Sequence, residues 1–282
     1  MCSPRTSSLF ALLLVPPPLA SSALRVFGPD GTRATVDGFV QALRADTGFR
    51  IAHHAPKLTS AGAQVDVTEV PATQAPTAFF DEGGLRIEAF EVDHFPVAPA
   101  LGYRFTFEGR TLVVSGDTTD CEALRAAATG ADLLVCEALN TAMLTARIAG
   151  VRAMGLELPA SLLEDVPSYH IATHDVARLA RDTGVRQLLI THVVPPIPNQ
   201  GPQVDEFLAG MSEIYTGPMR IALPIGYSRE KNTAAAPKAT NITPDHTSAL
   251  SEIPASFIAP ILLVMNTPPL ASDNALNSRK SD

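Results

Sequence analysis

A short stretch in the first half of the chain, residues 111–118, constrains the fold more than any other. Three consecutive apolar residues, Leu112, Val113 and Val114, lead through Ser115 into Gly116 and Asp117. A continuous apolar run that ends at a turn residue indicates a strand covered on both faces. Gly116 allows the backbone to turn sharply, so Asp117 is delivered to the edge of a sheet. Asp117 is then either a metal ligand or the cap of the helix predicted over residues 120–128.

Two histidines repeat this pattern at the ends of other predicted strands. His94 follows the apolar strand over residues 87–92, and His192 follows the strand over residues 188–190. Imidazole and carboxylate groups are the ligands that Zn²⁺ takes in catalytic sites. A single histidine at a strand end is more commonly an ordinary loop residue, and Asp117 alone is as consistent with a helix cap. All three together, at one edge of a sheet, predict a shared site.

The order of the predicted elements gives the fold class. Hairpins dominate the first half, and strands alternate with helices in the second half, which is typical of an α/β sandwich with helices outside the sheets. Strands are predicted over residues 24–27, 65–70, 85–92, 103–107, 111–114, 131–136 and 187–191, and helices over 32–45, 120–128, 138–154 and 174–183. His170 precedes the last of these helices, and His174 is placed either in the cleft or on the helix surface.

Composition limits the partners and divides the chain. The formal net charge of −8, with no cluster of Lys and Arg, argues against general phosphate attraction. Residues 24–230 are predicted to form the folded domain. Residues 1–23 are interpreted either as a remnant core helix or as a weak signal-like sequence, and residues 231–282 as a low-complexity, mostly disordered tail. No stretch is long and proline-free enough to span a membrane, and we expect a cytoplasmic protein.

Several segments resemble one family. Residues 91–94 with Gly102-Tyr103-Arg104, residues 115–118 with 131–138, and residues 169–170 with the closing His192 are similar to the ordered motifs of metallo-β-lactamase-fold hydrolases. The likeness is to the ribonuclease Z and arylsulfatase-like branch, and it covers most of residues 24–192.

The resemblance implies a fold and a mechanism. The fold would be the metallo-β-lactamase-type αββα sandwich. His94 would bind one zinc ion, Asp117 would bridge two, and His192 would bind the second. His170 would be the general acid that protonates the leaving oxygen, oriented by Glu137. A hydroxide activated by two zinc ions would hydrolyse a phosphodiester, as in RNA 3′-end processing, or a related ester bond.

The sequence departs from that family in its first metal motif. His-x-His-x-Asp-His occurs nowhere in the chain, so we expect an N-terminally truncated domain with impaired metal binding and impaired catalysis. The alternative is a non-catalytic binding or dimerisation module on the same fold.

The segment between Arg104 and Val114 also departs from the tRNA-processing members. It is a plain hairpin, without room for the insertion with which those members grip tRNA. A small phosphodiester or ester substrate is therefore expected and tRNA is not favoured, while a homodimer is an expectation carried by the resemblance.

Overall fold

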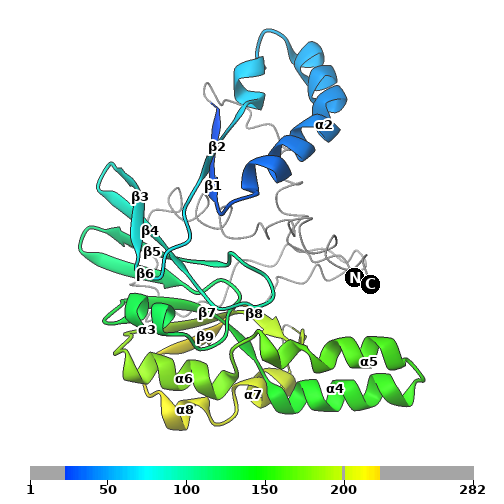
Figure 1. Cartoon of the computed structure of the whole chain (residues 1–282), viewed down its shortest axis with the longest axis vertical. Coiled ribbons are helices and arrows are strands. Elements are labelled where there is room, and N and C mark those ends of the chain that lie inside the picture. The colour runs from blue at the N-terminus through cyan, green and yellow to red at the C-terminus, as the bar shows by residue number, and fades with distance from the viewer. Residues whose placement is uncertain (1–22, 199–200, 223–282) are drawn as a thin grey trace, which may run out of the picture. The chain divides into compact units, whose positions relative to one another are not determined.

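The computed structural model describes residues 23–198 and 201–222, which fall into two compact units. Residues 23–26 and 36–66 belong to one unit, and residues 27–35 and 67–222 belong to the other. Figure 1 labels the elements along the chain. Every residue predicted to take part in a site lies in the second unit. The predicted segment 1–23, apart from Ala23, and the predicted tail 231–282 lie outside the described residues.

The elements nearest the N-terminus are a two-stranded sheet and a long helix. Strands β1 (Leu24–Gly28) and β2 (Val65–Glu69) pair with each other, and helix α2 (Thr32–His54) runs between them in sequence, followed by a 3-10 turn η1 (Ser60–Ala63). The helix was predicted to end near residue 45, and that end is wrong. Gly48 is accommodated within the helix, and Pro56 is the first residue that lacks the amide needed to continue it.

The second unit is organised on a seven-stranded mixed sheet in the order β3 to β9. Its first four strands are antiparallel and its last three run parallel to β6. Glu108-Gly109 closes the β5–β6 hairpin, as predicted. Strands β3 and β9 were not predicted. The strands are β3 (Thr77–Glu82), β4 (Leu85–Glu91), β5 (Leu101–Phe107), β6 (Arg110–Val114), β7 (Leu133–Leu139), β8 (Leu188–Val194) and β9 (Met219–Ile221).

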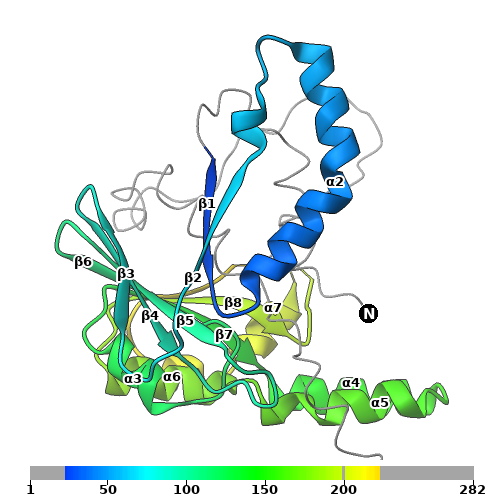
Figure 2. The same cartoon turned by 45° about the horizontal axis from the view of Figure 1, so that its top comes forward.

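Helices connect the parallel strands, and Figure 2 shows α3 and α6 on one side of the sheet. Helix α6 contacts β7, and α3 contacts β4. One helix was predicted over residues 138–154, followed by a loop; the structure instead has two helices, because Gly155 adopts a left-handed φ of 74° between them. The helices are α3 (Glu122–Ala128), α4 (Thr141–Ala153), α5 (Glu157–Glu164), α6 (Thr173–Asp182), α7 (Pro202–Leu208) and α8 (Met211–Ile214), with a 3-10 turn η2 (Val166–Ser168).

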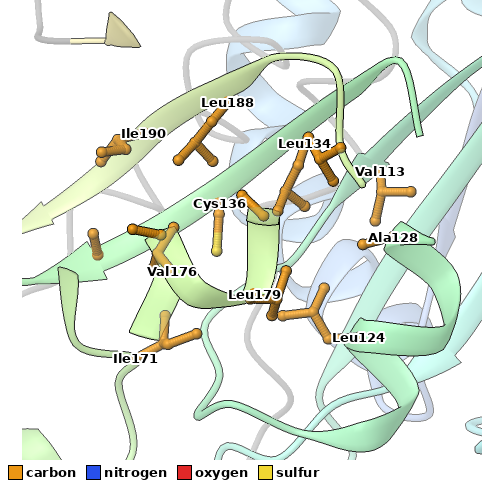
Figure 3. Packing of buried hydrophobic residues seen from close by; sticks show 14 of the residues in the cluster. Val113, Leu124, Ala128, Leu134, Cys136, Ile171, Val176, Leu179, Leu188 and Ile190 are labelled. Carbon is orange, nitrogen blue, oxygen red and sulfur yellow. The ribbon is translucent and has the colours of Figure 1, made fainter. Parts of the chain in front are cut away.

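The main core lies between the sheet and these helices. Alternate residues of β7, namely Leu134, Cys136 and Ala138, are fully buried in this core. Leu134 and Cys136 face Leu124 of α3 and Leu179 of α6 (Figure 3). Cys136 is therefore a core residue, and burial raises the pKa of its thiol well above the usual value. The apolar run that identified β7 as a strand is the run that fills this core.

The opposite face of the sheet is apolar as well. Tyr103 and Phe105 of β5 are buried on that face, and the Tyr103 ring lies 6.1 Å from that of Phe79, which in turn lies 5.3 Å from Phe27. Burial raises the pKa of the Tyr103 phenol. A sheet with apolar side chains on both faces is the pattern of a layered α/β domain. The predicted α/β class is therefore confirmed. No helix among the described residues is long and apolar enough to cross a membrane.

The steric requirement for glycine in the turn before Asp117 can be tested by comparing two glycines of similar backbone conformation. Gly116 has φ of 66°, and a Cβ there would lie 2.6 Å from the carbonyl oxygen of Leu101; Gly130 has φ of 69° and nothing within 4 Å. We expect Gly130→Ala to cost about 1 kcal/mol of unfolding free energy through backbone strain alone. Gly116→Ala adds a backbone collision and should cost about 2 kcal/mol more. Urea denaturation measures both, and equal losses would contradict this account.

Candidate functional site

The parallel strands bring the predicted site residues to one edge of the sheet. Asp117 follows β6, Glu137 lies near the end of β7, and His192 lies in β8. Because carboxyl ends of neighbouring parallel strands meet at the same edge, residues far apart in sequence become neighbours. The β7–β8 register shifts after Glu137, and His192 has an unusual positive φ of 41°. Such backbone strain is tolerated mainly at functional sites.

The side chains of Asp117, His170 and His192 bring atoms that can bind a metal close to one another. The donor atoms of Asp117, His170 and His192 all lie within 4.8 Å of one another. His192 Nδ1 is 3.0 Å from Asp117 Oδ1 and 3.4 Å from Glu137 Oε2, and His170 Nδ1 bonds directly to the same Glu137 oxygen. The predicted gathering of Asp117, Glu137, His170 and His192 is therefore present in the structure.

His94 lies beside this group rather than within it. Its Nδ1 is 2.7 Å from the carbonyl oxygen of Tyr169, which makes Nδ1 the donor and leaves Nε2 free. Its ring centroid is 5.3 Å from that of His170, which is itself 5.3 Å from that of His192. The three imidazoles thus form a row. The three mutually close residues are Asp117, His170 and His192, whereas the predicted metal ligands include His94 in place of His170. Which of these two histidines binds metal and which donates a proton stays a prediction.

Glu137 is the buried centre of the cluster. Only 1% of its side chain is exposed, and a carboxylate at such depth requires polar partners. One oxygen accepts the backbone N–H of Thr118, and the other faces His170 and His192. The backbone N–H of Glu137 donates to the hydroxyl of Ser115 over 3.2 Å. Glu137 therefore joins the segment that carries Asp117 to both histidines.

A second set of hydrogen bonds ties the His94 segment to the Asp117 segment. The Thr119 N–H donates to the carbonyl oxygen of Asp93 over 2.7 Å, and the Thr119 hydroxyl donates to the Asp93 carboxylate over 3.2 Å. Sequence reasoning missed Ser115, Thr119 and Asp93 as site-supporting residues. Ser115 could have been identified, because it is a small polar residue directly after an apolar strand. The Asp93–Thr119 contact joins residues 26 positions apart, and no local sequence pattern indicates it.

Two alternatives left open by the sequence can now be decided. Helix α3 begins at Glu122 with Cys121 at its N-cap, so Asp117 does not cap it, and the helix-cap interpretation is wrong. His174 is exposed on α6, and its Nε2 bonds to the carbonyl oxygen of Ala209 at 3.0 Å. The surface interpretation of His174 is therefore the correct one.

The Tyr169 ring flanks the row of imidazoles. It meets the His94 ring edge-on, with centroids 5.3 Å apart and planes at 90°, and it lies 4.9 Å from the ring of His170. Partial burial, with a smaller contribution from the charge of Asp165, raises the pKa of the Tyr169 phenol. Tyr169 therefore stays protonated at neutral pH and serves the cluster through its ring and its carbonyl oxygen.

Comparison with known proteins gives a family. The family model of the beta-lactamase superfamily domain matches residues 17–193. Ribonuclease Z of Mycobacterium marinum is 34% identical over 174 residues, which make up 62% of this chain and 56% of that protein. Ribonuclease Z of Mycolicibacterium paratuberculosis is 35% identical over 174 residues, with the same shares of the two chains. The chain thus spans little more than half the length of these relatives.

Among solved structures, the metallo-beta-lactamase fold protein YhfI from Bacillus subtilis is similar. Its TM-score is 0.46 at 17% identity, over 72% of this chain and 63% of that one.

The support that Ser115 gives to Glu137 can be measured against an exposed serine. Ser115→Ala leaves the buried N–H of Glu137 without its side-chain acceptor and should cost about 1–3 kcal/mol of unfolding free energy. Ser168→Ala is the matched control: the Ser168 hydroxyl donates to the carbonyl oxygen of Asp165 at 2.7 Å, as the Ser115 hydroxyl donates to that of Gly116 at 2.6 Å, but Ser168 is exposed. Its cost should stay within about 0.5 kcal/mol. Urea denaturation of both variants tests this, and a loss at Ser115 no larger than at Ser168 would refute it.

Proposed function

The chain belongs to the beta-lactamase superfamily, and from that premise we propose that it is a metal-dependent hydrolase of phosphodiester or related ester bonds. The observation that carries the proposal is the convergence of three imidazoles and two carboxylates at the edge formed by β6, β7 and β8. Relatives named ribonuclease Z support a phosphodiester as the bond that is cleaved.

We propose zinc as the metal, held by His94, Asp117 and His192. The donor set fits, since zinc sites combine imidazole nitrogen and carboxylate oxygen. His192 Nδ1 and Asp117 Oδ1 are 3.0 Å apart. This separation is short enough for both atoms to bind one zinc ion, whose nitrogen and oxygen ligands lie about 2.0–2.2 Å from it. When bound, zinc lowers the pKa of a coordinated water and neutralises charge that develops on the phosphate.

His170 and Glu137 supply the proton-transfer function in this proposal. Glu137 holds Nδ1 of His170, which fixes the orientation of the ring and leaves Nε2 for the substrate. The His170 side chain is only 8% exposed, so its position is set by the fold rather than by solvent. His170 would donate its proton to the leaving oxygen, and Glu137 would stabilise the protonated ring.

A small phosphodiester or ester is the substrate that we favour over tRNA. The β5–β6 hairpin closes through Glu108-Gly109 alone, without an arm that could hold a large RNA. The acidic net charge also gives no general attraction for a polyanion. The name of the relatives, ribonuclease Z, supports RNA as one candidate phosphodiester, and RNA 3′-end processing is the reaction that the family resemblance implies.

We further propose that metal binding by these residues is weak. His-x-His-x-Asp-His does not occur in the 282 residues, so His94, Asp117 and His192 act without its ligands. Fewer ligands lower both the affinity for metal and the rate that it supports. The same absence favours the second candidate, a non-catalytic binding or dimerisation module, which predicts no metal-dependent turnover at all.

Hydrolysis of bis(p-nitrophenyl) phosphate with added zinc or manganese tests the metal mechanism. We expect slow, metal-dependent turnover by the wild type, and a rate at least about 100-fold lower for Asp117→Ala, comparable with the largest effects of disturbing a metal site. Asp81→Ala is the control, because that carboxylate is exposed on β3. Equal rates for the wild type and Asp117→Ala would eliminate the mechanism, and no turnover by the wild type would favour the non-catalytic module.

A general-acid role of His170 can be distinguished from a metal-ligand role by changing the leaving group of the substrate. A p-nitrophenolate leaves without protonation, whereas an alkoxide requires a proton. As a general acid, His170 should affect the rate only where the leaving group is an alkoxide. His170→Ala should slow the hydrolysis of an alkyl phosphodiester by about 10²–10⁴-fold and leave the hydrolysis rate of the p-nitrophenyl ester nearly unaffected. Equal slowing of both substrates, with loss of bound zinc, would instead make His170 a ligand together with Asp117 and His192.

A further inference from the structure

An exposed aromatic residue directly follows His94, one of the proposed zinc ligands, in the sequence. Phe95 is 75% exposed, the largest value among the large hydrophobic side chains of the described residues. Its Cα is one peptide unit, about 3.8 Å, from that of His94. Val97, two residues further, is also exposed. We call Phe95 and Val97 the apolar rim. A contiguous exposed apolar patch that polar residues rim is a mark of an interaction or ligand-binding surface.

Hydrogen bonds hold the apolar rim in a fixed position. The Val97 N–H donates to the carbonyl oxygen of His94 over 2.9 Å, which closes a turn with Phe95 and Pro96 at its centre. The Phe95 N–H donates to the Asp93 carboxylate over 3.3 Å, and Asp93 is bound in turn by Thr119. The Phe95 backbone is therefore ordered before any ligand arrives, so binding does not have to order that segment.

The chemistry of the apolar rim selects the part of a substrate that it can contact. Residues 95–100, Phe-Pro-Val-Ala-Pro-Ala, contain no charged or hydrogen-bonding side chain. A phosphate gains nothing there, and in the proposed function it would bind at the metal that the site residues hold. A planar ring, by contrast, gains from stacking on an exposed phenylalanine, and every nucleobase offers such a face.

We propose that Phe95 is a specificity-determining residue that stacks on the nucleobase next to the scissile phosphate. This inference rests on the proposed phosphodiesterase function and assigns to Phe95 the contact that distinguishes a substrate with a base from one without. Phe95 binds the base and Val97 widens the apolar surface. The Phe95 N–H is held by the Asp93 carboxylate, and the Val97 N–H by the carbonyl oxygen of His94.

Direct binding tests the subsite without requiring catalysis. The probes are adenosine 5′-monophosphate (AMP) and ribose 5-phosphate, which share the phosphate and differ by the base, and equilibrium dialysis measures the Kd of each in the presence of zinc. The wild type should bind AMP about tenfold more tightly than ribose 5-phosphate, the scale expected for one stacked base. Phe95→Ala should lose that preference and leave ribose 5-phosphate binding unchanged, whereas Phe95→Tyr should retain the preference.

Phe49→Ala is the matched control, because Phe49 is 70% exposed on α2, in the other compact unit; it should bind both probes as the wild type does. Equal affinities of the wild type for the two probes, no binding of AMP, or a preference that survives Phe95→Ala would each overturn the subsite. A change in oligomeric state on Phe95→Ala with AMP binding intact would make the apolar rim a contact between copies and would also overturn it. Base-selective binding without hydrolysis would refute the proposed activity alone.

Discussion

The buried carboxylate of Glu137 is the constraint on which the site depends. A charged group at 1% exposure is stable only where polar partners surround it. Here they come from three directions: the Thr118 N–H after β6, His170 before α6, and His192 in β8. Because the carboxylate lies in the central strand of the three, each partner is held where it can meet the others. The core beneath β7 fixes Glu137, and Glu137 in turn positions both histidines and the segment of Asp117.

Much of this arrangement could be predicted from the sequence, because local pattern determined it. The apolar runs before His94, Asp117 and His192 identified β4, β6 and β8. The parallel strands β6, β7 and β8 are neighbours, so Asp117 and His192 come to one edge of the sheet. The resemblance drawn from the same segments is confirmed by the family match, and with it the metallo-β-lactamase-type fold. The strands themselves were predictable because a strand buried on both faces has a continuous apolar sequence. Two predicted ends were wrong: β7 continues past Cys136 to Leu139, and β8 continues to Val194, so that His192 lies within the strand and not after it.

What the sequence did not predict lies in contacts between distant segments and in weakly marked boundaries. The Asp93–Thr119 and Ser115–Glu137 hydrogen bonds join polar residues that each look like ordinary loop or strand-end residues. The last turns of α2 and the division of α4 from α5 depended on which glycine a helix tolerates: Gly48 is tolerated, and Gly155 is not. Short edge strands such as β9 have too few residues to show a period.

Zinc binding to the purified chain tests the central claim most directly. Equilibrium dialysis of the wild type, His192→Ala and Glu137→Gln at one pH compares a proposed ligand with the carboxylate that positions it. The account predicts saturable zinc binding by the wild type, lost in His192→Ala and weakened about 10–100-fold in Glu137→Gln, as for other residues that orient ligands. Identical zinc affinities for the three proteins, all of them folded, would contradict a metal centre organised around Glu137.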